Sequence, residues 1–139
     1  RFASLAIAGD IVGSETLLFG VYPFSATALT ECELSPWPEG EQALAGESML
    51  ASLARAQQRA AEIVALRGGQ AVDRVLGLVR LLADPQGLVV LPMRQDIADI
   101  TDLRFETISR IVKQLERAGV LVPERIAGVH ATRAFRYQA

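Results

Sequence analysis

The sequence contains few of the residues that catalysis and metal binding use. Its 139 residues include one cysteine, Cys32, and one histidine, His130. A single cysteine cannot form an intramolecular disulfide, and there is no Cys/His cluster to bind zinc or an iron–sulfur cluster. The sequence also shows no nucleophile–base triad and no glycine-rich loop of the P-loop type. We therefore expect neither an enzyme nor a metalloprotein.

Long apolar runs and a strong charge of one sign are missing as well. No run approaches the ~18 apolar residues of a transmembrane helix, and no signal peptide is visible. We therefore expect a cytoplasmic protein with no membrane partner. The net charge is −2, but residues 1–91 hold six Arg against ten Asp or Glu, whereas residues 92–139 hold eight Arg or Lys against six. The basic C-terminal third is compatible with nucleic-acid binding.

The composition is that of a packed globular protein, with half of the residues hydrophobic and 22% charged. Periodicity and punctuation by Gly and Pro predict both helices and strands, and therefore an α+β fold. The expected elements are a strand at 3–7, one or two strands within 25–38, helices at 47–67 and 71–84, a β run at 88–93, short helices at 94–101 and 104–116, and a hairpin within 119–137.

The helix expected at 47–67 has a seam of residues at alternating spacings of three and four, as in a coiled coil. The seam consists of Leu50, Leu53, Gln57, Ala60 and Val64. Two interpretations remain open: the helix packs on its own domain, or it pairs with a second copy of the chain. We favour the dimerisation helix, and Gly68-Gly69 is expected to end it.

The two short helices have the pattern of a helix-turn-helix. The first directs Ile97, Ala98 and Ile100 inward, and the small Ala98 suits the point where the helices cross. The second is expected to bury Phe105, Ile108, Ile111, Val112 and Leu115. The turn between such helices often contains Gly with a positive φ. Asp102 stands there instead, and Asp tolerates that conformation better than most residues. The β run before and the hairpin after predict a winged form.

Polar side chains remain outside the apolar stripe of the second helix. A solvated helix face would look similar, but this set is concentrated in the N-terminal half, which a recognition helix inserts into the major groove. Arg pairs bidentately with guanine, and Glu accepts from cytosine. We predict that Glu106, Ser109 and Arg110 read bases. The residues expected to contact phosphates, which set register without reading sequence, are Arg94, Gln95, Arg104, Thr107 and Lys113.

The segment RQDIADITDLRFETISRIVKQLERAGVL resembles the helix-turn-helix of the Crp/Fnr family of bacterial transcription regulators. The segment GDIVGSETLLFGVYPFSATALTECEL resembles the C-terminal half of that family's cyclic-nucleotide-binding-type β-roll, including its Gly-Asp-x-x-Gly turn. The resemblance implies a partial β-roll sensor domain at 1–46, a dimerisation helix at 47–68 and a winged helix-turn-helix domain at 69–139. Because the front of the roll is missing, we expect a fragment of a longer regulator.

The resemblance also implies a function. Glu-x-x-Ser-Arg, here Glu106, Ser109 and Arg110, is the recognition signature of the Fnr-like branch, which reads a TTGAT-type half-site. By this resemblance Arg110 contacts guanine, Glu106 contacts base edges of the complementary strand, and Ser109 contacts thymine or phosphate. The implied partners are double-stranded DNA on a palindromic operator and a second copy of the chain, with RNA polymerase as a further candidate.

The sensor part departs from the cyclic-AMP-binding members of the family. Those members carry Gly-Glu in the phosphate loop and Arg-Ser or Arg-Thr further on, whereas this chain has Gly13-Ser14-Glu15 and Phe24-Ser25. Without an arginine at 24 a buried phosphate would lack its counter-charge. Cyclic AMP is therefore disfavoured, an iron–sulfur cluster is disfavoured by the single cysteine, and no cofactor is predicted. The alternative function is a protein-interaction module that heterodimerises with another regulator.

Overall fold

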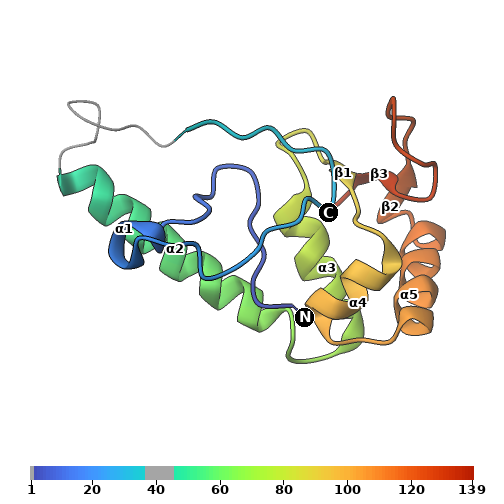
Figure 1. Cartoon of the computed structure of the whole chain (residues 1–139). Coiled ribbons are helices and arrows are strands. Elements are labelled where there is room, and N and C mark those ends of the chain that lie inside the picture. The colour runs from blue at the N-terminus through green and yellow to red at the C-terminus, as the bar shows by residue number, and fades with distance from the viewer. Residues whose placement is uncertain (1, 37–45) are drawn as a thin grey trace.

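Helices and strands are concentrated in the C-terminal two thirds of the chain (Figure 1). The structure is a computed structural model, and it describes residues 2–36 and 46–139. The elements are α1 (Thr16–Phe19), α2 (Gly46–Ala65), α3 (Ala71–Leu82), β1 (Leu88–Val90), α4 (Arg94–Thr101), α5 (Phe105–Arg117), β2 (Leu121–Pro123) and β3 (Ala134–Tyr137). Within these described ranges, no helix combines the length and the apolar character needed to cross a membrane.

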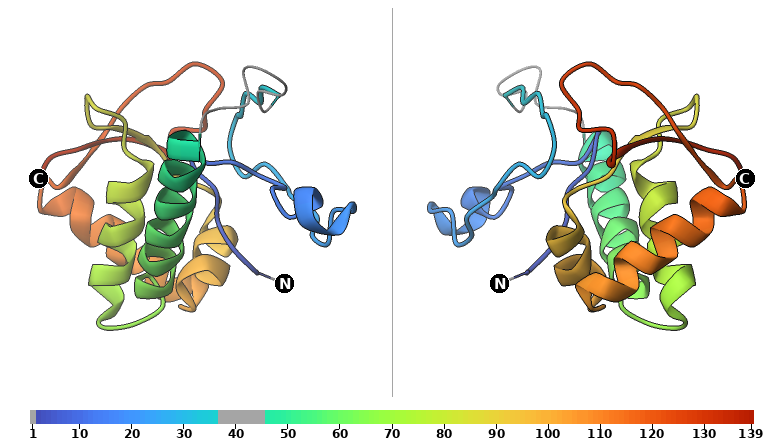
Figure 2. Two further views of the ribbon diagram at one scale, coloured as in Figure 1. Left: turned by 90° about the vertical axis from the view of Figure 1, so that its left-hand side faces the viewer. Right: turned by 90° about the vertical axis from the view of Figure 1, so that its right-hand side faces the viewer.

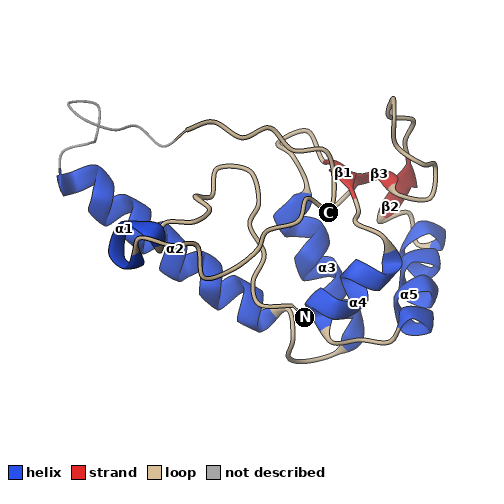
Figure 3. Cartoon of the chain, in the orientation of Figure 1, coloured by secondary structure: helices blue, strands red, loops and turns tan. Residues whose placement is uncertain are grey.

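The C-terminal part packs α3, α4 and α5 against a small antiparallel sheet (Figure 3). The strand order is β1-β3-β2, with Val89 opposite Phe135 and Val122 opposite Arg136. One hydrophobic cluster joins the helices to the sheet, and Phe135 is 1% exposed within it. The predicted mixture of helix and sheet is confirmed, and the expected hairpin is formed by β2 and β3.

The corner between α4 and α5 is as tight as the sequence predicts. Asp102 follows α4 with φ 55° and ψ 43°, the left-handed conformation that usually selects glycine. It is the one non-glycine residue with a positive φ in the part of the chain that the structure describes. Ala98 is buried, and Ile108 belongs to the same cluster. The left-handed position assigned to Asp102 is thus confirmed.

One inward position on α5 was predicted wrongly. Phe105 is 47% exposed, although Ile111 and Leu115 on the same helix are buried. Phe105 is the first residue of α5 and is not part of the hydrophobic cluster. Only the later turns of α5 pack on that cluster. Helical periodicity places a residue on a face, but it does not show where along the helix the core begins.

The strands predicted for the N-terminal part are also wrong: residues 2–36 form no β-strand and contain only the single turn of α1. These residues run as loops to one side of α2 (Figures 1 and 2). A strand needs a neighbouring backbone to take its hydrogen bonds, and the bonds here are local, such as Asp10 N–H to the Ile7 carbonyl at 2.9 Å. Residues 2–36 therefore do not form the expected half β-roll. The part of the roll predicted at 37–45, including the end of the strand segment expected within 25–38, lies outside the described residues.

Among the described residues, contacts at two places attach α2 to the rest of the chain. The Arg59 guanidinium binds the Asp10 carboxylate at 2.9 Å, and this hydrogen bond raises the pKa of Arg59. About one turn further along, Ile63 near the C-terminal end of the helix and Leu66 just after it are 6% and 4% exposed. The C-terminal end of α2 is therefore part of the same packed unit as α3, whereas its middle part extends away from the sheet (Figure 1).

Candidate nucleic-acid interface

Helix α5 has a buried side and an exposed polar side. Ile108, Ile111, Val112 and Leu115 are buried. On the opposite side Glu106, Arg110 and Lys113 are exposed, and Ser109 is half-buried. Their spacings of three and four residues place these polar residues on one face. The right-hand view of Figure 2 shows α5 crossing the outer surface of the domain.

The polar face of α5 is not used for internal interactions. The side chains in question are those of Glu106, Ser109, Arg110 and Lys113. Within the described residues, none of the four forms a hydrogen bond or an ion pair with another part of the protein. A carboxylate acceptor, a hydroxyl and a guanidinium are thus available within about two turns. This is the donor and acceptor set that reads base edges in a major groove.

The residues predicted to contact phosphates do not form one cluster. Arg104 is exposed at the N-terminal cap of α5, and Thr107 lines a shallow hollow with Arg110 and the start of α3 at Gln70. Gln95 on α4 is exposed, but its amide donates to the Asp99 carboxylate at 3.2 Å. Three of the predicted residues, Arg104, Thr107 and Lys113, are therefore on α5 or at its start.

Arg94 is held by the protein itself. Its Nη2 donates to the Thr132 carbonyl at 2.7 Å, in the loop between β2 and β3. Burial lowers the pKa of Arg94, and the carboxylate of Glu116 opposes that effect. Arg94, which was predicted to contact a phosphate, thus holds α4 against the loop between β2 and β3, the wing loop.

The wing loop has a second internal tether. Arg133 donates through Nε to the Leu91 carbonyl at 2.7 Å and through Nη2 to the Leu29 carbonyl at 3.2 Å. His130 is exposed, and its Nδ1 is 2.8 Å from the Thr132 hydroxyl. The loop is therefore fixed at its base by arginines, while His130 faces outward.

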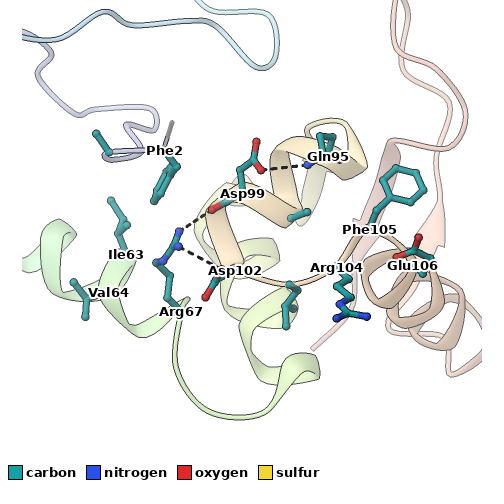
Figure 4. Close-up of a pocket in the computed structure, with 13 residues that line it drawn as sticks. Phe2, Ile63, Val64, Arg67, Gln95, Asp99, Asp102, Arg104, Phe105 and Glu106 are labelled. Atoms are coloured by element: carbon teal, nitrogen blue, oxygen red, sulfur yellow. Dashed lines mark hydrogen bonds and ion pairs between the residues drawn. The ribbon is translucent and has the colours of Figure 1, made fainter.

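Sequence reasoning missed the arginines that surround the helix-turn-helix corner. Figure 4 shows a groove beside this corner, bordered by Phe2, Ile63, Arg67, Asp99 and Asp102. Arg67, just after α2, donates to the Asp99 carbonyl at 2.7 Å. The two residues are 32 positions apart, so no local sequence signal could have paired them.

The predicted seam of α2 faces outward in the single chain. Leu50, Leu53 and Val64 are 69%, 61% and 72% exposed, and Gln57 and Ala60 are exposed as well. Exposed apolar side chains that gather on one face of a helix are typical of a surface that binds a partner. The alternative in which this face packs on its own domain is not what the structure shows.

The described ranges hold no group of three or more His, Cys, Asp or Glu residues arranged to bind a metal ion. Cys32 is exposed, and its thiol donates to the Thr30 carbonyl at 3.3 Å.

The fold and the exposed face together define a winged helix-turn-helix domain preceded by a long helix. The chain is homologous, at modest identity, to the nitrogen fixation regulation protein FixK of Rhizobium meliloti (strain 1021). The two are 31% identical over an alignment of 126 positions, and the match covers 87% of this chain and 59% of FixK.

A solved structure is also similar, that of FixK2 from Bradyrhizobium japonicum. The identity is 30% and the TM-score 0.48, over 68% of this chain and 47% of the FixK2 chain. The chain thus spans about half the length of the relatives it matches. No family model matches it.

Proposed function

We propose that this chain is the dimerisation and DNA-binding part of a Crp/Fnr-type transcription regulator, and that α5 reads a specific DNA sequence. One observation carries this proposal: Glu106, Ser109 and Arg110 lie together, without internal partners, on the outer face of the second helix of a helix-turn-helix. The homology to FixK, which is named as a regulation protein, supports it.

The proposed half-site is of the TTGAT type. Arg110 donates to O6 and N7 of its guanine, Glu106 accepts from a base of the complementary strand, and Ser109 contacts thymine or phosphate. Each such base contact is expected to contribute ~1–3 kcal/mol of discrimination. Arg104, Thr107 and Lys113 on the same helix would hold the flanking phosphates and fix the register.

Binding is proposed to be dimeric, through the exposed seam of α2. A two-fold dimer places two recognition helices on the two halves of a palindrome. The regulator would act in the cytoplasm, and RNA polymerase is a candidate partner. Cyclic AMP is not proposed as its signal, because position 24 carries an exposed phenylalanine where the cyclic-AMP-binding members have arginine.

The test is selection of bound duplexes from a random pool with the purified chain. Enrichment of two inverted TTGAT-like half-sites is expected, followed by a gel shift with a TTGAT-N4-ATCAA duplex. A chain that is dimeric yet enriches no sequence and shifts no duplex at low salt would overturn the proposal. That result would favour the alternative, a module that heterodimerises with another regulator.

A further inference from the structure

The C-terminal end of α4 receives its hydrogen bonds from outside the helix. The last four carbonyls of any α-helix lack partners within it. The Ala98 carbonyl accepts the backbone N–H of Leu103 at 3.2 Å. The next two are reached by one guanidinium: Nη1 of Arg67 lies 2.7 Å from the Asp99 carbonyl and 3.3 Å from that of Ile100.

A second arginine completes the set. Nη1 of Arg74, on α3, donates to the carbonyl of Thr101, the last residue of α4, at 3.1 Å. The same side chain donates through Nε and Nη2 to the Gly69 carbonyl at 3.1 and 2.9 Å. Three of the four terminal carbonyls of α4 are therefore bound by two arginines from other elements. Cations at this end of a helix also interact favourably with its dipole.

These two arginines lie on either side of a glycine hinge. Arg67 precedes Gly68-Gly69 and Arg74 follows it. Gly69 has a φ of 77°, and neither glycine has atoms near the position of an added Cβ. Two adjacent glycines in open space restrict the backbone very little. The angle between α2 and α3 must therefore be set by contacts outside the hinge.

Packing supplies only part of that restraint. Leu66, just after α2, belongs to the hydrophobic cluster, and Ile63 is buried one turn earlier, so the apolar contacts lie at the end of α2 next to the hinge. Charge-assisted hydrogen bonds depend on direction more than apolar packing does. Arg67 also carries a 3.7 Å ion pair to the Asp102 carboxylate and lies over the Phe2 ring, 5.3 Å from its centre. This combination holds the guanidinium in one orientation at the corner (Figure 4).

We propose that Arg67 and Arg74 form a clamp that fixes the recognition helix relative to α2, and that the clamp determines which spacing between half-sites the dimer accepts. This inference rests on the proposed function. In a dimer joined through α2, the angle at the hinge sets the distance between the two α5 helices. Arg67 and Arg74 are therefore positioning residues: they do not touch DNA, and they restrict the geometry of those that do.

The first test needs no DNA. Spin labels are attached to Ala51→Cys on α2 and Glu116→Cys on α5 in a Cys32→Ser chain, which is then diluted with unlabelled chain. The distance between the labels within one chain is measured by pulsed electron spin resonance. One narrow distribution is expected for the parent. Arg67→Ala and Arg74→Ala are expected to broaden it, and an unchanged distribution in both variants would overturn the clamp.

The second test measures affinity for a series of palindromes that differ only in the length of the spacer. The parent should prefer one spacer. Arg67→Ala and Arg74→Ala should reduce that preference by at least about fivefold, while the preferred half-site sequence stays the same. An equal loss of affinity at every spacer length would contradict the proposal, because general damage to the domain acts in that way.

The matched control is Arg55→Ala, an exposed arginine on α2 that forms no hydrogen bond or ion pair with the other described residues. It should change neither the distances nor the spacer preference. If Arg67→Ala does not fold, Arg67→Lys replaces it. The distance distribution of Arg67→Lys should be broader than that of the parent. If the parent binds no DNA but the label distances respond as expected, the proposed function fails and the clamp remains.

Discussion

Leu66 and Gly77 fit together where α2 meets α3. A Cβ added to Gly77 would lie 2.9 Å from Cδ2 of Leu66, closer than real Cβ contacts allow. Leu66 is 4% exposed, so its side chain has little room to move away. Glycine inside a helix is destabilising by roughly 0.5–1 kcal/mol relative to alanine. The chain therefore accepts a poor helix former in α3 to let α2 approach.

The Gly77→Ala variant is expected to be destabilised by about 1 kcal/mol, because overpacking outweighs the gain in helix propensity. In a Leu66→Ala background the same change should be stabilising, since the clash is gone and the propensity gain remains. Urea denaturation of the four proteins in this cycle measures the coupling. A Gly77→Ala variant that is more stable in both backgrounds would show that Leu66 moves freely.

Asp102 offers a second prediction about stability. Its left-handed conformation is unfavourable for most residues, and its ion pair to Arg67 is long and 73% exposed at the Asp102 side chain. Such pairs contribute ~0–1 kcal/mol. Asp102→Gly should therefore leave the free energy of unfolding unchanged or raise it slightly. Asp102→Val should lower it by about 1–2 kcal/mol, because a β-branched side chain is strained in this conformation whereas Asp tolerates it. Thermal melts of the two variants against the parent distinguish these outcomes.

Arg110 should act at one position of the operator. Arg110→Ala is expected to weaken the free energy of DNA binding by ~1–3 kcal/mol when the natural base is present at that position. It should also relax the specificity for that base pair. Competition binding with operators altered one base pair at a time provides the measurement. Lys113→Ala, on the same face of α5, is the control and should weaken all operators alike. If Arg110→Ala also weakened all operators equally, its role in base readout would be excluded.

Arg94→Ala should weaken binding to all sequences and reduce the slope of log affinity against log salt by about one unit. Affinities at four salt concentrations, with Arg55→Ala as the control, give the slope. Arg94 also donates to the wing carbonyl of Thr132, so affinity could fall for a structural reason. An unchanged slope with lower affinity would assign Arg94 to holding the wing and not to a phosphate.

The seam of α2 should support a dimer. Leu53→Glu places a charge where the proposed interface excludes water, and it should convert the chain to monomers in sedimentation velocity. Ala51→Glu adds the same charge to another exposed face of the helix and should leave the dimer intact. Persistence of the dimer in Leu53→Glu would locate the interface elsewhere.

The sequence was informative where structure depends on local pattern. Ile108, Ile111 and Leu115 could be placed inside because helical period determines which face a residue occupies. The left-handed residue at 102 followed from the need for a tight corner between two short helices. The polar face of α5 could be recognised because burial could not account for it.

The sequence was uninformative where partners are distant. A strand near residue 5 depends on a neighbouring backbone that local pattern does not reveal, and none pairs with it in the described chain. The bonds of Arg67 and Arg74 to α4 span 27 to 33 positions. The exposure of Phe105 depends on how far the core extends along α5. Each failure concerns a feature that depends on a distant part of the chain, which local pattern does not reveal.

The bond between Arg133 and the Leu29 carbonyl has a consequence for the order of folding. It joins residues 104 positions apart. At ordinary rates of synthesis the segment around Leu29 leaves the ribosome roughly 5–20 s before Arg133 does. That segment has no strand of its own to hold it meanwhile. Its attachment to the wing is therefore among the last tertiary contacts that a newly made chain can form.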